Sequence, residues 1–236
     1  MTMAHYHDNP QQFEPHELEP DAIRRDSAIA IAEAAGGNFG LGALSIAAIA
    51  NGGGSPTVIE MVHDMSDGVT HGVEAYGAHS DDETVQETTR GAVVGTIVLA
   101  SAVVGYKAGV DLTDPGHEPS GTATAIQAVV ATGNVVIHKR LHTARHKIAD
   151  RIAASKAAGH DTSKIERQLN LDGAHVHTKV DSVMAPGLFG AMVVSWATKS
   201  PQVADGATVF AAAYTAVANA VPYARTRGWL PTRRAR

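Results

Sequence analysis

Long stretches rich in Ala, Gly, Ile and Val alternate with short polar segments along most of this chain. Six such stretches approach the roughly twenty residues that a helix needs to cross a bilayer. They are residues 27–50, 56–78, 89–110, 123–138, 174–197 and 203–221. The segments between them are rich in turn formers, for example NGGGSP at 51–56 and DLTDPGHEPSG at 111–121. The pattern therefore predicts an all-α fold, a bundle of six transmembrane helices.

The second stretch also carries a polar stripe. Its charged and imidazole residues are spaced by three, four, four and three positions, the repeat of one helix face. They are Glu60, His63, Asp67, His71 and Glu74. Residues on the other faces, such as Val62 and Val69, are apolar. A helix with such a stripe inside a bundle needs a partner for it, and a divalent cation is the simplest candidate.

A second segment repeats part of this spacing. His177 and Asp181 are separated as His63 and Asp67 are, and an apolar run follows them. Residues at i and i+4 share one helix face, so each pair offers two ligands to one point. Two facing pairs supply two nitrogens and two oxygens, a tetrahedral set that suits zinc, and two carboxylates offset the charge of a dication.

The rest of the polar stripe permits two interpretations. Glu60, His71 and Glu74 either line an entry or exit path for the ion or form the wall of a solvated groove. Small residues elsewhere favour close helix packing in the predicted bundle. They are Gly36, Gly40, Gly42, Gly91 and Gly95.

Composition limits the function classes. The chain has 236 residues, 44% of them hydrophobic and none of them cysteine, which excludes disulfides, thiolate metal ligands and a thiol nucleophile. A net charge of -5 provides no broad basic surface for nucleic acid. The mean hydropathy of -0.07 is low for a membrane protein. The polar second helix therefore crosses a bilayer only if its neighbours shield the stripe.

Positive charge is distributed unevenly between the predicted helices. With both chain ends in the cytoplasm, 16 of the 19 Lys and Arg residues fall in cytoplasmic segments. The opposite loops hold only Lys107 and Lys199, and Lys179 falls within the fifth predicted helix. This asymmetry follows the positive-inside rule, and it predicts an integral membrane protein with cytoplasmic termini.

Three segments flank or connect the predicted helices on the cytoplasmic side. Residues 1–26 are expected to form a disordered tail, 139–173 a basic loop that is helical in part, and 222–236 a short basic tail. The tail and the loop contain histidines that could collect metal: His5, His7, His16, His142, His146 and His160. We favour solvated side chains in the tail and a basic face against lipid phosphates in the loop.

These features occur in an order that resembles the cation diffusion facilitator family, proton-coupled exporters of zinc and related metals with six transmembrane helices. GGGSPTVIEMVHDMSD is similar to the family's turn and H/D-x-x-x-D motif in the second helix. DGAHVHTKVDS is similar to its H-x-x-x-D motif in the fifth helix. Asn134 falls in the fourth helix and Ala204-Asp205 opens the sixth, so the resemblance covers residues 27–221.

The resemblance implies that His63, Asp67, His177 and Asp181 hold a transported ion, zinc in particular. It implies export by proton-coupled alternating access from the cell (inner) membrane, with no catalytic residue and no prosthetic group. Protons and metal would compete for the same side chains. The expected partners are the metal ion, protons and lipids. The family's soluble dimerising C-terminal domain is missing here, which leaves a homodimer as an open alternative.

Two other classes compete with this interpretation. The adjacent pair His63-Asp64 is typical of soluble helical metal-dependent phosphohydrolases, although the further ligands available, His16 and Asp111, fall in the tail and a loop. A helical metal-storage protein requires paired E-x-x-H motifs, which the sequence lacks. Asp64 is expected to pair structurally, with Lys179 or another helix, and His175 lies off the face of His177.

Overall fold

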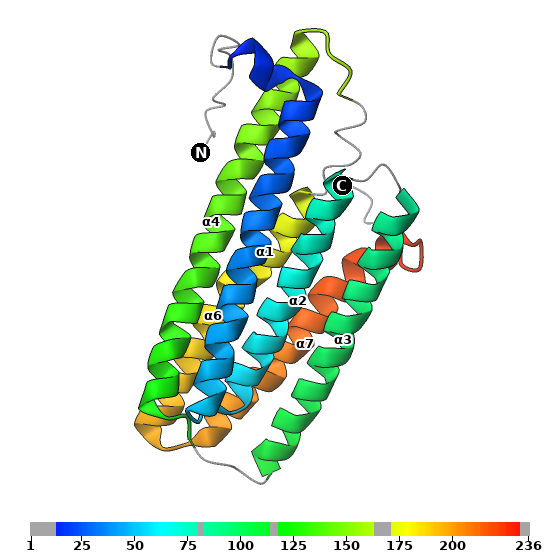
Figure 1. The fold of residues 1–236 in the computed structure, drawn as a ribbon. Helices are drawn as coiled ribbons and strands as arrows, with labels where there is room; N and C mark the ends of the chain where they lie inside the picture. The colour runs from blue at the N-terminus through cyan, green and yellow to red at the C-terminus, as the bar shows by residue number, and fades with distance from the viewer. Residues whose placement is uncertain (1–12, 80–82, 114–117, 163–170, 232–236) are drawn as a thin grey trace, which may run out of the picture.

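The computed structural model describes residues 13–79, 83–113, 118–162 and 171–231, and these ranges contain α-helices and no strand. The predicted all-α class is confirmed (Figure 1). A short 3-10 helix, η2, spans Pro15–Leu18. The α-helices are α1 (Pro20–Ala50), α2 (Gly54–His79), α3 (Glu83–Thr113), α4 (Gly121–Ala157), α6 (Leu171–Thr198) and α7 (Pro201–Thr226).

The turn between α1 and α2 is built on glycine. Gly52 and Gly54 have φ angles of 84° and 66°, a conformation that side chains with a Cβ rarely adopt. Ser120 ties this turn to the start of α4, because its backbone N–H donates to the Gly52 carbonyl at 3.1 Å. The Ser120 hydroxyl also accepts a hydrogen bond from the Ala123 N–H at 3.0 Å and so caps α4. Three helix ends are thereby held together.

Helix α2 occupies the centre of the bundle. It lies against α1, α3, α6 and α7, while α4 packs on α1 and α6 on the far side. Figure 1 shows that the first part of α1 and the last part of α4 run side by side and project beyond the other helices. With 37 residues, α4 is about 55 Å long, well above the roughly 30 Å of a bilayer core. Because four helices pack against α2, its polar stripe is covered mainly by protein.

The interior is layered along the bundle axis. One apolar cluster joins α1 to the second half of α4 through Ile31 and Leu141. Another joins α2, α3, α6 and α7 through Ile59, Val104 and Leu188. Along α2, the polar stripe lies between Ile59 of the second cluster and Ala75, which packs against the first cluster. The buried polar positions at this level form the polar layer referred to below.

Small residues bring α1 close to α2. A Cβ at Gly42 would lie 2.9 Å from the Met65 side chain, and one at Gly68 would lie 3.0 Å from the Phe39 ring. These two glycines therefore determine how closely the helices approach. The prediction of close contact was wrong for three of the selected glycines, which have open space beside them: Gly36, Gly40 and Gly95.

Helices α1 and α4 extend into segments that the hydropathy pattern assigned to a tail and a loop. Helix α1 begins at Pro20, inside the segment expected to be a disordered tail, and α4 continues to Ala157 through the first half of the predicted basic loop. Burial explains both extensions. Arg151 is 2% exposed, pairs with Asp26 at 2.6 Å and donates to the Glu17 carbonyl. Hydropathy alone cannot reveal an arginine that binds the start of the chain.

We expect Arg151→Gln to release this N-terminal segment. The substitution removes the ion pair with Asp26 and most of the donation to Glu17, at a cost of roughly 1–3 kcal/mol in local stability. Limited proteolysis should then cut within residues 13–26 several times faster, with unchanged helix content. Arg145→Gln, one and a half turns earlier in α4, serves as the control. Equal cleavage of the two variants would contradict the anchoring role.

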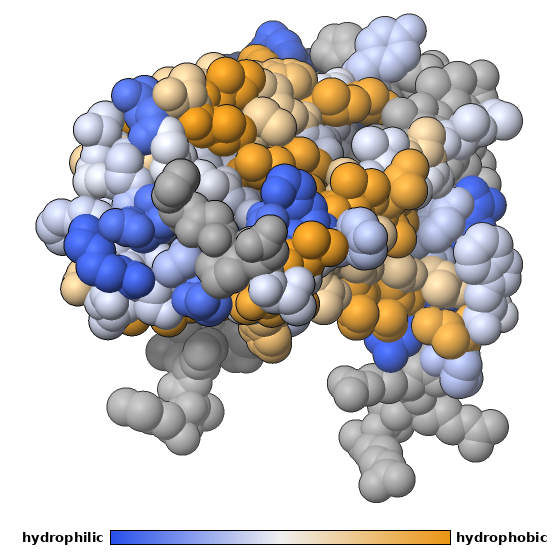
Figure 2. All heavy atoms as spheres, turned by 90° about the horizontal axis from the view of Figure 1, so that it is seen from below, coloured by the Kyte–Doolittle hydropathy of each residue, from blue (hydrophilic) through white to orange (hydrophobic). Residues whose placement is uncertain are grey.

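Many large apolar side chains lie on the outer surface of the bundle. Three helical segments are long and apolar enough to cross a membrane: α1, Val94–Thr113 and Lys179–Thr198. Large apolar side chains point outward, for example Leu99 at 67% and Phe210 at 71% exposure. Figure 2 shows the end of the bundle, where hydrophilic groups lie among apolar ones. The described part of the chain therefore contains three helices that could span a membrane.

Candidate metal centre

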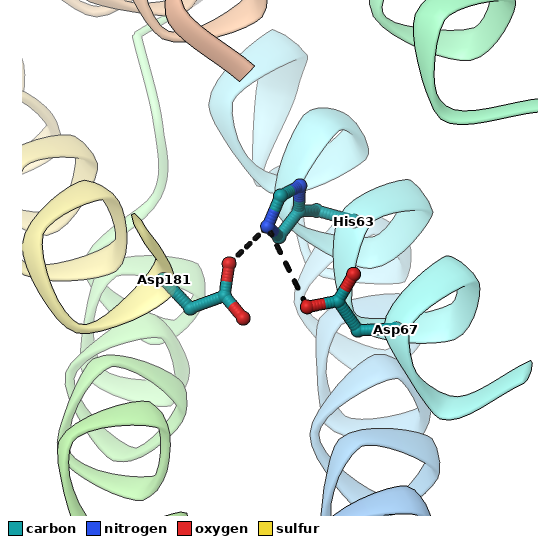
Figure 3. A group of neighbouring side chains, drawn as sticks. All are labelled: His63, Asp67 and Asp181. Carbon is teal, nitrogen blue, oxygen red and sulfur yellow. Dashed lines mark hydrogen bonds and ion pairs between the residues drawn. The ribbon is translucent and has the colours of Figure 1, made fainter. Parts of the chain in front are cut away.

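Three predicted ligands meet in the polar layer. His63 and Asp67 lie one turn apart on α2, and Asp181 reaches them from α6 (Figure 3). The His63 Nε2 atom contacts the Asp181 carboxylate and lies 3.9 Å from Asp67 Oδ2. One ligand atom from each residue lies within 4.8 Å of those of the other two. Residues 118 positions apart in sequence thus converge on one point.

Burial makes this group chemically unusual. His63, Asp67 and Asp181 are 7%, 0% and 2% exposed. Two carboxylates held this close in a water-poor interior repel one another unless positive charge lies between them. A divalent cation at the centre would balance the two charges, and a proton shared between His63 and Asp181 would balance one. The site therefore has the donors and the charge to exchange one for the other.

The fourth predicted ligand, His177, lies on α6, the helix that also carries Asp181. His177 is four residues before Asp181 on α6, which places the two positions on one face. The side chain of His177 lies outside the described residues, so its role as a ligand stays a prediction.

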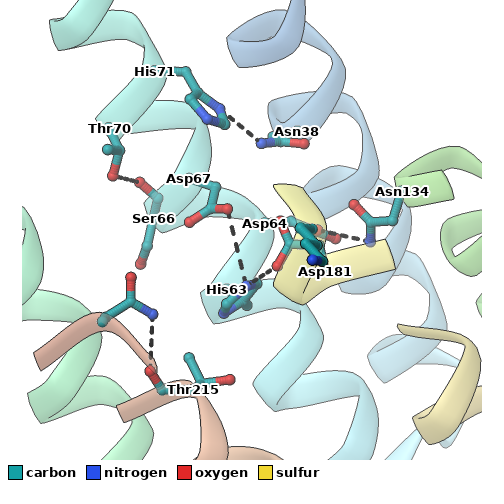
Figure 4. Close-up of polar contacts among 12 residues, drawn as sticks. Asn38, His63, Asp64, Ser66, Asp67, Thr70, His71, Asn134, Asp181 and Thr215 are labelled. Atoms are coloured by element: carbon teal, nitrogen blue, oxygen red, sulfur yellow. Dashed lines mark hydrogen bonds and ion pairs between the residues drawn. The ribbon is translucent and has the colours of Figure 1, made fainter. Parts of the chain in front are cut away.

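A second polar group adjoins the three ligands. The Asn134 amide on α4 donates hydrogen bonds to Glu60 Oε1 at 2.9 Å and to Asp64 Oδ1 at 3.1 Å. All three side chains are at most 3% exposed. The expected structural pairing of Asp64 is confirmed, and the partner is Asn134 on α4 (Figure 4). Asn134 thus joins α4 to α2.

The upper part of the stripe is also enclosed. His71 is 0% exposed, and its Nδ1 lies 3.2 Å from the Asn38 amide on α1 (Figure 4). Glu74, one turn nearer the end of α2, is half-buried. Glu60, His71 and Glu74 therefore continue along protein-covered positions of α2. Their burial makes the interpretation as a solvated groove wall wrong for Glu60 and His71, while a role in an ion path stays a prediction.

Sequence reasoning missed a cavity near the α1–α2 turn, whose mainly apolar lining includes four polar or charged side chains. The cavity has a volume of about 320 Å³ and is lined partly by Ser55, Lys107, Asp111 and Asp205. Ser55 donates to Asp111 at 2.9 Å, and Lys107 pairs with the same carboxylate at 3.0 Å. The i, i+4 spacing of Lys107 and Asp111 was the available signal. What could not be anticipated was that α2, α3 and α7 bring these groups together.

No protein-family model matches the chain, and no curated protein matches its sequence. What the site can do therefore follows from its donors, burial and charge.

Proposed function

We propose that this protein is a membrane transporter that exports divalent metal cations, zinc foremost, in exchange for protons. The proposal includes a six-span arrangement similar to that of cation diffusion facilitators. The observation that carries it is the convergence of His63, Asp67 and Asp181 from two helices inside a polar layer. A buried mixed imidazole and carboxylate set, without thiolates, has the ligand chemistry of zinc.

The surroundings of the site favour transport over storage or catalysis. Apolar clusters lie on either side of the polar layer, which is expected of a gated path that never opens fully to both sides. Apolar side chains on the outside and ionisable ones on the inside are typical of a bundle in lipid. The 16 cytoplasmic Lys and Arg residues of the proposed topology agree with this placement.

The phosphohydrolase alternative gains no such support. An HD-type site uses the adjacent His and Asp on one metal, whereas His63 contacts Asp181 on α6 and Asp64 accepts from Asn134 on α4. The two neighbours are engaged by different helices. We therefore carry only the transporter forward.

Competition for one pair of atoms provides the coupling. A proton between His63 Nε2 and Asp181 occupies the nitrogen lone pair and the oxygen that a cation would need. Metal binding from the cytoplasmic side expels that proton, and protons arriving from the other side expel the metal. Since the ligands belong to α2 and α6, relative movement of these helices would change which side reaches the site. The exchange is thus one of alternating access.

Reconstitution of the full chain in lipid vesicles tests the function. The vesicles contain a zinc-sensitive dye and a pH-sensitive dye. Added Zn²⁺ should enter through those protein molecules whose cytoplasmic side faces outward, while protons leave the vesicles. Calcium should give at least about tenfold less flux, because Ca²⁺ prefers six or more oxygen ligands. Zinc uptake without any proton movement would overturn the coupling. Recovery of the full chain in a salt-washed soluble fraction would overturn the membrane assignment.

The direction of the pH dependence follows from the ligands. A proton on His63 occupies the lone pair that a metal ion would need, so apparent zinc affinity should rise with pH on the loading side. On the release side, acidification should instead speed zinc loss. Vesicles with independently set inner and outer pH measure the two effects. Identical responses on both sides would contradict the proposed exchange.

A further inference from the structure

The cavity near the α1–α2 turn combines an aliphatic wall with a charged corner. It lies where α2 and α7 begin and α3 ends, at the non-cytoplasmic end of the proposed topology (Figure 1). The charged corner consists of Lys107 and Asp111 on α3 and Asp205 on α7, beside Ser55 on α2. The candidate metal centre uses none of these residues. The aliphatic wall comes from α1, α2 and α3, through Ile49, Val58, Val103 and Val104.

The charges in this corner do not balance. Lys107 pairs with Asp111 at 3.0 Å, which leaves the carboxyl group of Asp205 over. Lys199, the other lysine at this end of the bundle, pairs with Glu118 at 3.3 Å. Asp205 is only 7% exposed and makes no ion pair among the described residues. The corner therefore has room for one more positive charge.

Hydrogen bonding does not make up for the missing cation. The Ser55 hydroxyl donates to Asp111 at 2.9 Å, and it also lies within reach of Asp205. A hydroxyl has one proton to donate, so it serves one of the two carboxyl groups at a time. A buried carboxylate without a cation or a full set of donors is costly. Because Asp205 lines the cavity, the missing partner is a cationic hydrogen-bond donor inside it.

The size and lining of the cavity indicate an organic cation and not a bare metal ion. Its volume of about 320 Å³ is roughly ten times that of one water in the liquid and lies within the range of small-molecule clefts. Calcium and magnesium require about six oxygen ligands, whereas most of this lining is aliphatic. The described lining includes no aromatic ring, the group that recognises quaternary ammonium. A primary ammonium with an apolar body fits both parts.

We propose that this cavity binds a primary ammonium group carried on a short aliphatic body. The ammonium lies beside Asp205 and leaves the pair of Lys107 and Asp111 intact, so two cations face two carboxylates. The aliphatic wall covers the alkyl part. Either a soluble alkylamine or an ethanolamine lipid supplies such a group, and Val103, which is 61% exposed, borders the cavity on the outer surface of α3. This binding does not depend on the proposed metal transport.

Calorimetric titration of the detergent-solubilised full chain with n-hexylammonium tests the binding. We expect one saturable site, and at least about tenfold weaker binding of hexan-1-ol, which has the same alkyl body without the charge. The n-butylammonium ion is two methylenes shorter and should bind roughly 15-fold more weakly. Equal affinity for the alcohol and the amine would overturn the proposal, as would equal affinity for the two amines. These comparisons use the unaltered chain, so they do not require any variant to fold.

Substitutions in the lining locate the site. Asp205→Asn keeps the size of the side chain and removes its charge, so hexylammonium should bind at least about tenfold more weakly. Val58→Phe fills the apolar part of the cavity and should abolish binding. Asp21→Asn, in the first turn of α1 at the opposite end of the bundle, is the matched control and should bind as the unaltered chain does. Unchanged affinity in the Asp205→Asn variant would overturn the proposal.

A pair of short-chain lipids distinguishes the two sources of the ammonium group. Displacement of hexylammonium by dihexanoyl phosphatidylethanolamine would support a lipid as the ligand, and no displacement would support a soluble amine. Dihexanoyl phosphatidylcholine should not displace it in either case, because a quaternary ammonium has no N–H to donate to Asp205. Equal displacement by the two lipids would overturn recognition of a primary ammonium.

Discussion

Replacement of Asp181 by Asn is expected to abolish zinc transport while the protein still inserts and folds. The amide has nearly the size of the carboxylate and can still hydrogen-bond His63, so α2 and α6 keep their contact. What is lost is the negative charge and one ligand oxygen. Substitution of residues that only orient metal ligands lowers metal affinity or activity about 10–100-fold, so substitution of a direct ligand should lower zinc flux at least about 100-fold.

Vesicle uptake compared at equal protein amounts measures this loss. Asp21→Asn provides the matched control, since that carboxylate is 89% exposed in the first turn of α1. It should retain full transport. His63→Gln should match Asp181→Asn in flux, because both remove a ligand of the same ion. Zinc transport at the unaltered rate in either ligand variant would exclude the central site as the binding site for the cargo.

Replacement of Asn134 by Leu is expected to give the largest loss of stability. Its amide donates to Glu60 and to Asp64, and all three side chains are at most 3% exposed. Leu leaves two buried carboxyl groups without that donor. A buried hydrogen-bonding group left without its partner costs about 1–3 kcal/mol, so the loss of both bonds is expected to cost roughly 3 kcal/mol. This corresponds to a fall in Tm of about 10 °C.

Thermal unfolding in detergent tests this value, and Gln127→Leu is the matched control. Gln127 lies two turns earlier on α4, is 0% exposed, and neither of its amide atoms has a hydrogen-bond partner among the described residues. Its replacement by an apolar residue should leave stability unchanged or slightly raised. Equal destabilisation by the two substitutions would show that the change in side-chain volume lowers stability and that the hydrogen bonds to the carboxyl groups do not contribute.

The sequence alone does not identify which residues pair across helices. Asp64 was expected to pair, but Lys179 and helix partners were equally available to it in sequence terms. The structure assigns it to Asn134, because α4 packs against α1 and α6, which both lie against α2, and this brings the Asn134 amide to α2. The same applies to Arg151, whose long side chain reaches a backbone carbonyl 134 residues away. No local pattern encodes such distances.

Helical periodicity by itself determined the all-α class, the polar stripe on α2 and the equal spacing of His63–Asp67 and His177–Asp181. These properties are local, since they depend only on which residues share a face of one helix. Tertiary structure decided that α2 and α6 face each other at one level, that Asn134 serves two carboxyl groups, and that α4 continues to Ala157. Each depends on contacts between distant segments, which arise only when the helices pack and exclude water.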